Sequence, residues 1–245
     1  MDLGISGRRA AVAAASAGLG LASARALAEA GCTVAICGRD RSRIDAAATA
    51  IGAVPIVVDV GTPDGATEFV ETAAAILGGV DILVTNAGGP PAGTFETTPL
   101  DAYTTAIDLN LMSVVAMCKR AVPAMREQQW GRVVAITSIA VRQPIGTLIL
   151  SNTARAGATA FLKTLALEVA ADGVTVNSVQ PGLHATDRMK ALGRDLESVA
   201  RTVPAHRMGQ PADFGNVVAF LCSEHARFVT GTAMPVDGGQ YLGLQ

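Results

Sequence analysis

The chain has 245 residues, of which half are hydrophobic and only 16% are charged, and its formal net charge is −2. This balance gives no electrostatic basis for binding nucleic acid or an anionic membrane, so a small molecule is the expected partner. A single α/β domain over residues 1–245 buries enough surface to fold without a metal or a disulfide.

The sequence carries no feature typical of export, membrane insertion or metal binding. Residues 1–9 lack the apolar core of a signal peptide, and no apolar run reaches the roughly 20 residues that span a bilayer. The four cysteines, at positions 32, 37, 118 and 222, form no CxxC pair and no cluster with a histidine. We therefore expect a cytoplasmic protein with buried thiols and no metal site.

Short apolar runs alternate with longer helical patterns along the whole chain. In chain order we expect a strand at Arg9–Ala14, a helix at Leu19–Ala30, a strand at Thr33–Cys37, a helix at Arg41–Ile51, a strand at Val54–Asp59, a helix capped by Thr62, a strand at Val80–Asn86, a helix from Thr98-Pro99 to Met125, a strand at Arg132–Ser138, a helix at Asn152–Ala171, a strand at Val174–Val179, a helix at Ala212–Ser223 and a strand at Ala233–Val236. The expected strands are almost continuously apolar, so neither face of the sheet is expected to be exposed to solvent. The pattern predicts an α/β fold with a doubly wound parallel sheet of about seven strands and helices on both faces.

The segment from Gly182 to Pro211 interrupts this alternation. It is the longest stretch without a clear strand pattern. Long irregular segments in compact domains are often functional, so we expect residues 182–211 to form a substrate lid.

A run of small residues joins the first expected strand to the first expected helix. It reads Ala14-Ala15-Ser16-Ala17-Gly18-Leu19-Gly20. Such a loop points helix N–H groups at a pyrophosphate, but small residues also let a helix pack closely on a sheet. The loop by itself is compatible with both interpretations.

Further short motifs follow the later strands. They are, in order, Asp59-Val60, Asn86-Ala87-Gly88, Asn110, Ser138, Pro181-Gly182 and Val236-Asp237-Gly238-Gly239. Together with the small-residue loop, this series resembles the short-chain dehydrogenase/reductase family, in particular its 3-oxoacyl-ACP reductase-like members, over nearly the whole chain. One departure lies in the family's TGxxxGxG loop, because Ala13 and Ala14 replace its Thr-Gly pair. We expect the turn at Ala14 to use a backbone conformation open to alanine.

The resemblance implies a Rossmann-type fold that binds a nicotinamide dinucleotide. It implies that Asp59 reads the adenine edge, that residues 86–88 flank the ribose, and that residues 181–186 line the nicotinamide. The expected cofactor-binding residues, including two that are argued below, are Ala14, Ser16, Gly18, Leu19, Gly20, Arg39, Asp59, Val60, Asn86, Ala87, Gly88, Arg155, Pro181, Gly182 and Thr186.

The end of the second expected strand discriminates NADP(H) from NAD(H). An acidic residue there would bond the ribose hydroxyls and repel a 2′-phosphate. The chain instead reads Cys37-Gly38-Arg39, and Arg39 together with the hydroxyl of Ser16 suits a phosphate. We therefore expect NADP(H). Asp40 leaves NAD(H) open, and a solvated surface charge is the alternative interpretation of Arg39.

The catalytic motif of the family is altered. The resemblance implies a tyrosine that exchanges a proton with the substrate, a lysine that tunes it and holds the ribose, a serine that polarises the carbonyl and an asparagine that supports a proton relay. Ser138 and Asn110 occupy the last two positions, but Ser151 and Arg155 replace the tyrosine and the lysine. Arginine stays protonated up to a pH above about 12, and a serine hydroxyl is shorter and less acidic than a phenol.

Other residues offer a proton only by less direct routes. His184 follows Pro181-Gly182 and titrates near neutrality, but a loop or surface role is the alternative. Tyr103 is expected to pack away from the site, and Tyr241 reaches a site only in a neighbouring subunit. Arg142 is expected on the pocket rim, where it meets an acidic substrate or remains solvated.

Two functional hypotheses stay open. The first is an NADP(H)-dependent oxidoreductase that interconverts a ketone and a secondary alcohol by direct hydride transfer with an atypical proton donor, a water held by Ser151, or His184. The second is a non-catalytic NADP(H)-binding protein, either a redox sensor or a partner subunit of an active reductase. The resemblance also implies a homotetramer assembled through the helices that carry Asn110 and Arg155.

Overall fold

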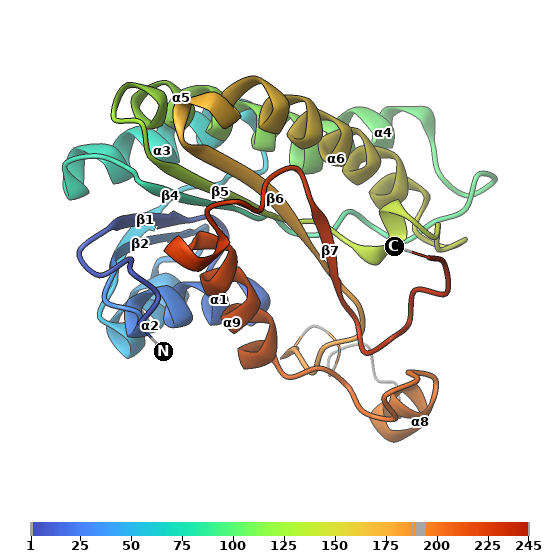
Figure 1. The fold of residues 1–245 in the computed structure, drawn as a ribbon. Coiled ribbons are helices and arrows are strands. Elements are labelled where there is room, and N and C mark those ends of the chain that lie inside the picture. The colour runs from blue at the N-terminus through green and yellow to red at the C-terminus, as the bar shows by residue number, and fades with distance from the viewer. Residues whose placement is uncertain (1, 188, 190–194, 245) are drawn as a thin grey trace.

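Seven apolar segments form one parallel sheet in the computed structural model of the chain, which describes residues 2–187, 189 and 195–244 (Figure 1). The strand order is β3-β2-β1-β4-β5-β6-β7, which confirms the predicted doubly wound sheet. The strands are β1 (Arg9–Val12), β2 (Thr33–Gly38), β3 (Val54–Val57), β4 (Ile82–Thr85), β5 (Gly131–Ile136), β6 (Val174–Pro181) and β7 (Ala233–Val236).

Helices cover both faces of the sheet (Figure 1). One face carries α3 (Pro63–Leu77), α4 (Leu100–Ile107), α5 (Ser113–Glu127) and α6 (Ile149–Val169), and the other carries α1 (Gly18–Glu29), α2 (Arg41–Ile51) and α9 (Pro211–Cys222). A π-helical turn at Asp108–Met112 joins α4 to α5, and short 3₁₀ turns lie at Ile139–Val141, Ala170–Asp172 and Glu224–Ala226. The short helix α8 (Leu196–Arg201) lies beyond the carboxyl ends of β6 and β7 (Figure 1).

Each face of the sheet has its own apolar core. Phe69 of α3 and Met117 of α5 are fully buried on one face, and Leu27 of α1 and Phe214 of α9 are fully buried on the other. Burying one such side chain stabilises the fold by roughly 1.5–3 kcal/mol relative to exposure. Strands covered on both sides explain why the sequence pattern is continuously apolar rather than alternating.

Helix caps follow the predicted signals in one case and depart from them in another. Thr62 caps α3 by accepting a hydrogen bond from Gly65 N at 3.2 Å, with Pro63 in the first turn, as predicted. The prediction that Thr98 caps the next helix is wrong, because Pro99 itself adopts the extended N-cap conformation and α4 begins at Leu100. The side-chain oxygen of Thr98 is instead buried.

The predicted ends of several strands need correction. The strands β1, β3 and β5 end two residues earlier than expected and β4 ends one residue earlier, because the residues beyond them belong to the loops at the carboxyl edge of the sheet. Other elements extend further than expected. β6 continues to Pro181 because it pairs with β7, and α6 begins at Ile149 rather than residue 152.

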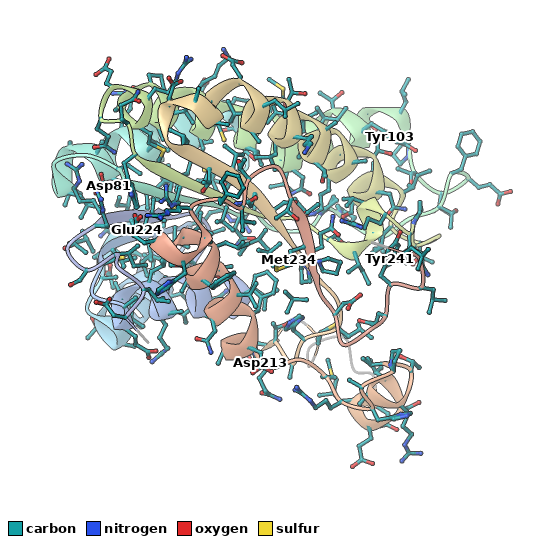
Figure 2. All side chains as sticks on the ribbon, in the orientation of Figure 1. Asp81, Tyr103, Asp213, Glu224, Met234 and Tyr241 are labelled. Atoms are coloured by element: carbon teal, nitrogen blue, oxygen red, sulfur yellow. The ribbon has the colours of Figure 1, made fainter. Side chains whose placement is uncertain are left out.

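Arg9 and Asp81 form a partly buried ion pair at the amino edge of the sheet. Arg9 donates hydrogen bonds from Nη2 to Oδ1 at 2.6 Å and from Nε to Oδ2 at 2.9 Å of Asp81 (Figure 2 labels Asp81). Burial alone would raise the pKa of Asp81, but the hydrogen bonds from Arg9 outweigh it and hold that pKa below its usual value. The ion pair therefore links the start of β1 to the residue before β4 at the amino edge.

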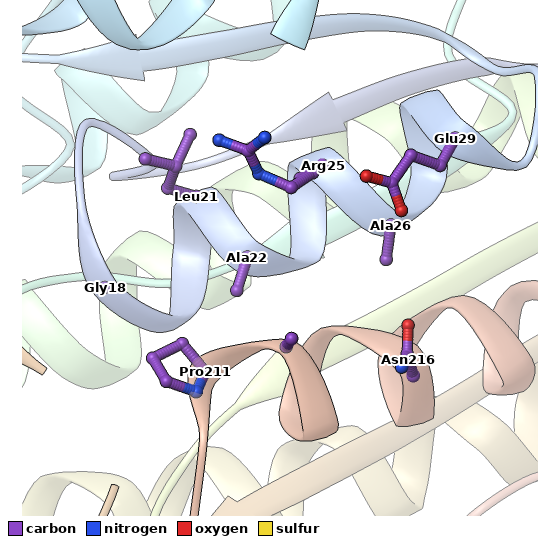
Figure 3. Close-up of a pocket in the computed structure, with 9 residues that line it drawn as sticks. Gly18, Leu21, Ala22, Arg25, Ala26, Glu29, Pro211 and Asn216 are labelled. Atoms are coloured by element: carbon purple, nitrogen blue, oxygen red, sulfur yellow. The ribbon is translucent and has the colours of Figure 1, made fainter. Parts of the chain in front are cut away.

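The helices α1 and α9 pack closely because Gly215 has no side chain. A Cβ at Gly215 would meet the backbone carbonyl of Ala22, so any larger residue would push the two helices apart. A shallow groove of about 210 Å³ runs between them, with Ala22 near the Pro211 end of α9 and Ala26 opposite Asn216 (Figure 3). Within the described parts of the chain, no helix combines the length and the apolarity needed to cross a membrane.

Candidate active site

The carboxyl edge of the sheet gathers most of the expected site residues. The strand order reverses direction between β1 and β4, since chain connections run outward from β1 to β3 and then return to β4. In doubly wound sheets, ligands bind in the crevice beyond such a reversal. The small-residue loop follows β1, and the Asn86-Ala87-Gly88 motif follows β4, so both lie at this crevice.

Ala14 adopts a left-handed backbone conformation with φ of 47°. The expectation that this turn would use a conformation open to alanine is therefore wrong. The turn keeps the shape that glycine normally adopts, because three contacts fix it: Ala14 N donates to Cys37 Sγ at 3.3 Å, Ala15 N donates to Cys37 O at 2.9 Å, and Asn86 Nδ2 donates to Ala14 O at 3.1 Å. A left-handed alanine costs roughly 1–2 kcal/mol, so the loop stores strain.

Cys37 holds the turn at Ala14 through a hydrogen bond that the sequence did not predict. Its side chain is fully buried at the end of β2, and burial raises the pKa of its thiol to about 12, so it stays a neutral hydrogen-bonding thiol. The sequence showed only a cysteine outside any ligand spacing. Its contact with Ala14 depends on how the loop folds over β2, which spacing does not reveal.

The first turn of α1 is open to an anion. Its N-cap residue, Ala17, makes no side-chain capping bond, and the first turn contains no acidic residue. Uncapped N–H groups at a helix N-terminus bind phosphate through hydrogen bonds and the helix dipole. Gly20 brings the helix close to the sheet, since a Cβ there would lie 2.7 Å from Ala14 O and 2.8 Å from Asn86 Nδ2. Leu19, between the two glycines, is half-buried.

Arg39 and Asp59 lie close together at the carboxyl edge, just beyond β2 and β3. Arg39 Nη1 lies 3.7 Å from Asp59 Oδ2, and the two side chains are 78% and 55% exposed. An ion pair this exposed contributes about 0–1 kcal/mol, so Arg39 is easily drawn to a stronger anion. Ser16 lies beside Gly38, the residue before Arg39, because a Cβ at Gly38 would lie 3.2 Å from Ser16 Cβ. Val60, the residue after Asp59, is buried in the core.

The polar groups after β4 are linked to the π-helical turn. Asn110 lies in this turn, is 2% exposed and donates from Nδ2 to the carbonyl oxygen of Gly88 at 2.9 Å. A Cβ at Gly88 would meet no atom within 4 Å, so open space lies beside it, and Ala87 is half-buried. π-Helical turns occur mostly at functional sites. The sequence predicted Asn110 but not its π-helical backbone.

Ser138 and the guanidinium of Arg155 both lie at the end of β5. Ser138 Oγ accepts a hydrogen bond from Ala140 N at 3.1 Å, which uses an acceptor position and leaves its proton for a ligand. Arg155 reaches from the second turn of α6 and donates from Nη1 to the carbonyl oxygen of Ile136 at 2.9 Å. Ser151 is half-buried in the first turn of the same helix. The guanidinium charge is thereby held at the carboxyl end of β5.

His184 is packed rather than open. Its side chain is 4% exposed, its ring stacks edge-on against Phe214 at 5.4 Å, and a Cβ at Gly209 would lie 2.7 Å from its Cδ2. Burial lowers its pKa from the usual 6.5, although a hydrogen bond to Gly182 O and two nearby carboxylates act in the opposite direction. This packing favours a structural role in the lid and argues against the proton-donor hypothesis.

The beginning and the end of the lid are tied together around His184. Ala185 N donates to Gly209 O at 2.9 Å, and Gly209 N donates to Leu183 O at 3.0 Å. The expected nicotinamide-lining segment, Pro181 to Thr186, also lies near the phosphate loop, since a Cβ at Gly18 would lie 3.7 Å from Thr186 Cγ2. Residues 188 and 190–194 of the predicted lid lie outside the described residues.

The two tyrosines lie on different elements at the periphery (Figure 2). Tyr103 is half-buried on α4, whereas Tyr241 follows β7, and its ring lies 5.5 Å from the guanidinium carbon of Arg142. Arg142 donates from Nη2 to the carbonyl oxygen of Ala233 at 2.5 Å. Leu242 N donates to Gln143 Oε1 at 3.3 Å, so the C-terminal segment covers the expected pocket rim.

No cluster of three or more metal-ligating side chains occurs among residues 2–187, 189 and 195–244. The cysteines at positions 32, 37, 118 and 222 are free and buried. The described side chains at the carboxyl edge offer hydroxyl, amide and guanidinium groups, next to the small-residue loop after β1. The fold and this edge define a dinucleotide-binding α/β protein.

Comparison with known proteins identifies the family. The family model for Enoyl-(Acyl carrier protein) reductase matches residues 13–240. Dehydrogenase/reductase SDR family member 4 of Oryctolagus cuniculus is 35% identical over 237 residues, which is 93% of this chain and 91% of the relative. The 3-oxoacyl-(acyl-carrier-protein) reductase FabG of Escherichia coli (strain K12) is 34% identical over 239 residues, 96% of this chain and 98% of the relative.

A solved structure matches the fold over its full length. The crystal structure of L-sorbose reductase from Gluconobacter frateurii, complexed with NADPH and L-sorbose, superposes with a TM-score of 0.94 at 34% identity and covers 100% of both chains. The chain belongs to the short-chain dehydrogenase/reductase family and is an oxidoreductase of that type.

Proposed function

We propose that the chain is an NADP(H)-dependent oxidoreductase that interconverts a ketone and a secondary alcohol by direct hydride transfer, with an atypical proton donor. NADPH, when bound, supplies the hydride. The residues that would hold it are the strained loop at Ala14, the uncapped N-terminus of α1, Arg39 with Ser16, the Asn86 to Gly88 motif and Arg155.

The observation that carries the choice of NADP(H) is the position of Arg39. It follows β2 directly, lies 3.7 Å from Asp59 and has the Ser16 side chain as a neighbour across Gly38. A 2′-phosphate carries more charge than the Asp59 carboxylate and accepts a bidentate bond from a guanidinium, so it displaces the exposed pair. NADPH in the solved structure of L-sorbose reductase supports the same choice.

From the end of β5, Ser138 would act on the substrate carbonyl and Arg155 on the nucleotide. The Ser138 hydroxyl would donate a hydrogen bond to the substrate carbonyl oxygen and stabilise the negative charge that develops there. Arg155, held at the end of β5 by its bond to Ile136 O, would place a positive charge beside the nicotinamide ribose and would donate hydrogen bonds to its hydroxyls. These two groups perform the binding and polarising parts of the family's chemistry.

Proton delivery is the altered part of the reaction. Ser151 is too short to replace a phenol directly, so a water held by its hydroxyl gives a proton to the alkoxide, and the hydroxide left behind takes a proton from bulk solvent. The buried ring of His184 is a poor alternative because its contacts with Phe214 and Gly209 enclose it. A water donor is weaker than a tuned tyrosine, and the expected turnover is therefore slow.

A non-catalytic NADP(H)-binding protein is the second candidate. The observation that favours it is the replacement of both titratable residues of the motif, because neither Ser151 nor Arg155 titrates near neutral pH. A redox sensor, or a partner subunit of an active reductase, needs the nucleotide site but no proton donor. The nucleotide site therefore fits both candidates, and turnover separates them.

A kinetic screen tests the enzyme proposal against the sensor proposal. NADPH oxidation is followed by stopped flow with 3-oxoacyl thioesters, diketones and quinones, with Ser138→Ala as the matched control. Turnover that Ser138→Ala lowers by on the order of 100-fold supports the oxidoreductase, since removal of one polarising donor costs about that much. Tight NADP⁺ binding without turnover on any substrate supports the sensor.

We also propose a cytoplasmic homotetramer that uses α5 and α6. Met112, before α5, and Leu167 of α6 are 38% and 72% exposed, and an apolar groove between α3 and α5 includes Val115 and Ala116. Apolar surface on two adjacent helices is typical of a subunit interface. Light scattering after size-exclusion chromatography checks the mass, and a monomer would contradict the assembly.

A further inference from the structure

Gln180 is a fully buried amide at the carboxyl end of β6. Its side chain is 0% exposed, and neither Oε1 nor Nε2 has a hydrogen-bond partner among the described residues. A buried polar group without a partner costs about 1–3 kcal/mol, so such groups in native proteins usually have a functional or ligand-binding reason. Gln180 directly precedes Pro181 and Gly182, the expected border of the nicotinamide site.

The strand alternation places Gln180 on the side of α6. Val174 and Val176 belong to the core beneath α5 and α6, whereas Val179 belongs to the core beneath α1 and α9. Because successive side chains on a strand point to opposite faces, Gln180 shares the face of Val174 and Val176. Its amide therefore lies between the sheet and α6.

The height of Gln180 along α6 follows from the element geometry. The helix runs back along β6 and ends at Val169, close in sequence to the first strand residue, Val174 (Figure 1). Six strand residues rise roughly 20 Å, which equals about 13 residues of helix, so Gln180 lies at the level of Arg155. The strand register agrees, since Arg155 bonds Ile136 O and Ile136 pairs with Val179, the neighbour of Gln180.

Arginine needs more acceptors than the lysine it replaces. A guanidinium carries five N–H donors in a rigid plane, whereas an ammonium carries three around one atom. Donors that do not reach the ribose hydroxyls must be satisfied beneath α6. A carboxylate there would cancel the positive charge, but an amide oxygen accepts a hydrogen bond and leaves the charge intact.

We propose that Gln180 is the positioning residue for Arg155, its side-chain oxygen accepting a hydrogen bond from the guanidinium when Arg155 turns toward the nicotinamide ribose. This inference rests on the proposed function, because it requires Arg155 to hold the nucleotide. On this proposal Gln180, a buried residue of β6, orients Arg155, the arginine that stands in place of the family's lysine.

The test is a double-mutant cycle read by calorimetric titration with NADP⁺. Gln180→Met keeps the volume and removes the amide, and Arg155→Lys removes the planar donor. We expect Gln180→Met to weaken NADP⁺ binding by about 3- to 10-fold, the size of one hydrogen bond to a charged group, without lowering the Tm of the nucleotide-free protein. In the Arg155→Lys background, the same change is expected to alter Kd by less than about twofold.

Thr175→Val is the matched control. Thr175 lies on β6 and is buried with an unpartnered hydroxyl, but it points to the opposite face, toward α9. We expect this variant to keep the wild-type Kd and to keep or raise the Tm. If Gln180→Met does not fold, Gln180→Leu takes its place in the cycle.

The outcomes separate this inference from the proposed function. Gln180→Met with a wild-type Kd, or with an equal loss of binding in the Arg155→Lys background, overturns the positioning role while the proposed function stands. A lowered Tm with an unchanged Kd shows that the amide is structural, and it overturns the role as well. If the wild-type protein binds neither NADP⁺ nor NAD⁺, the proposed function is wrong and the inference falls with it.

Discussion

Arg155 of α6 donates a hydrogen bond from Nη1 to the carbonyl oxygen of Ile136, the last residue of β5, at 2.9 Å. This bond fixes a permanent positive charge two residues from Ser138, the expected carbonyl-polarising hydroxyl. In the proposed function this arginine holds the nucleotide, but it does not tune the pKa of a neighbour near neutrality, because it does not release its own proton there. On that proposal, the altered motif separates ribose binding from proton delivery.

Restoring the family motif should restore proton delivery. The double change Ser151→Tyr and Arg155→Lys introduces a phenol and an amine, both of which titrate within tuning range of neutral pH. We expect kcat to rise by on the order of 10²-fold and to acquire a dependence on pH, because general acid catalysis contributes about that much. The measurement is steady-state NADPH oxidation between pH 6 and 9. Unchanged kcat in a folded double variant would show that proton transfer does not limit turnover.

Arg39 is expected to set the cofactor preference. Replacing it with alanine removes a charge-assisted bond to the 2′-phosphate, which is worth about 1.5–3 kcal/mol, or on the order of 10- to 100-fold in Kd. Binding of NAD⁺ should hardly change, because NAD⁺ has no phosphate there. Arg41→Ala is the matched control, since Arg41 is also an exposed arginine, in the first turn of α2. Equal losses for both nucleotides would contradict the assignment of Arg39.

Ala14→Gly should remove the strain in the phosphate loop. The left-handed alanine costs roughly 1–2 kcal/mol, and a glycine loses about 0.4–1 kcal/mol through the freedom of the unfolded chain. We therefore expect the free energy of unfolding to rise by about 0.5 kcal/mol, measured by urea denaturation. The same substitution at Ala46, exposed in the middle of α2, should lower it by about 1 kcal/mol. A loss at Ala14 as large as that at Ala46 would count against a strained loop.

His184 should make the fold sensitive to mild acid. Burial lowers its pKa in the folded protein below the unfolded value of 6.5, so the unfolded chain binds the proton first. Its contribution to stability is fully present above about pH 6.5 and is lost as the pH falls from there through the lowered folded pKa. We expect the Tm gap between wild type and His184→Leu to shrink from pH 7.5 to pH 5.5. A constant gap across that range would mean that His184 does not titrate differently on folding.

The architecture and the location of the site were predictable from the sequence. The apolar strands, the helices between them and the small-residue loop fixed a doubly wound sheet, and the motifs after each strand fell at its carboxyl edge. Helix α8 was not predicted, because its six residues, Leu196–Arg201, are too few to show a helical period. The sheet, its covering helices and the positions of the motifs were predictable because they depend on local sequence patterns.

The features that were missed depend on tertiary contacts. The left-handed turn at Ala14 exists because Cys37 and Asn86 form hydrogen bonds with its backbone. The sequence does not show that these distant residues meet Ala14. His184 occupies a promising place in the chain but is enclosed by Phe214, which comes from a distant helix. The buried amide of Gln180 likewise became visible only when the face of β6 was known.

The central claim is that this chain binds NADP(H) through Arg39 and the strained loop. Calorimetric titration of the wild-type protein with NADP⁺ and with NAD⁺ in the same buffer tests it most directly. We expect NADP⁺ to bind at least about tenfold more tightly, which corresponds to about 1.4 kcal/mol from the 2′-phosphate. Equal affinity for the two nucleotides, or binding of neither, would contradict the account.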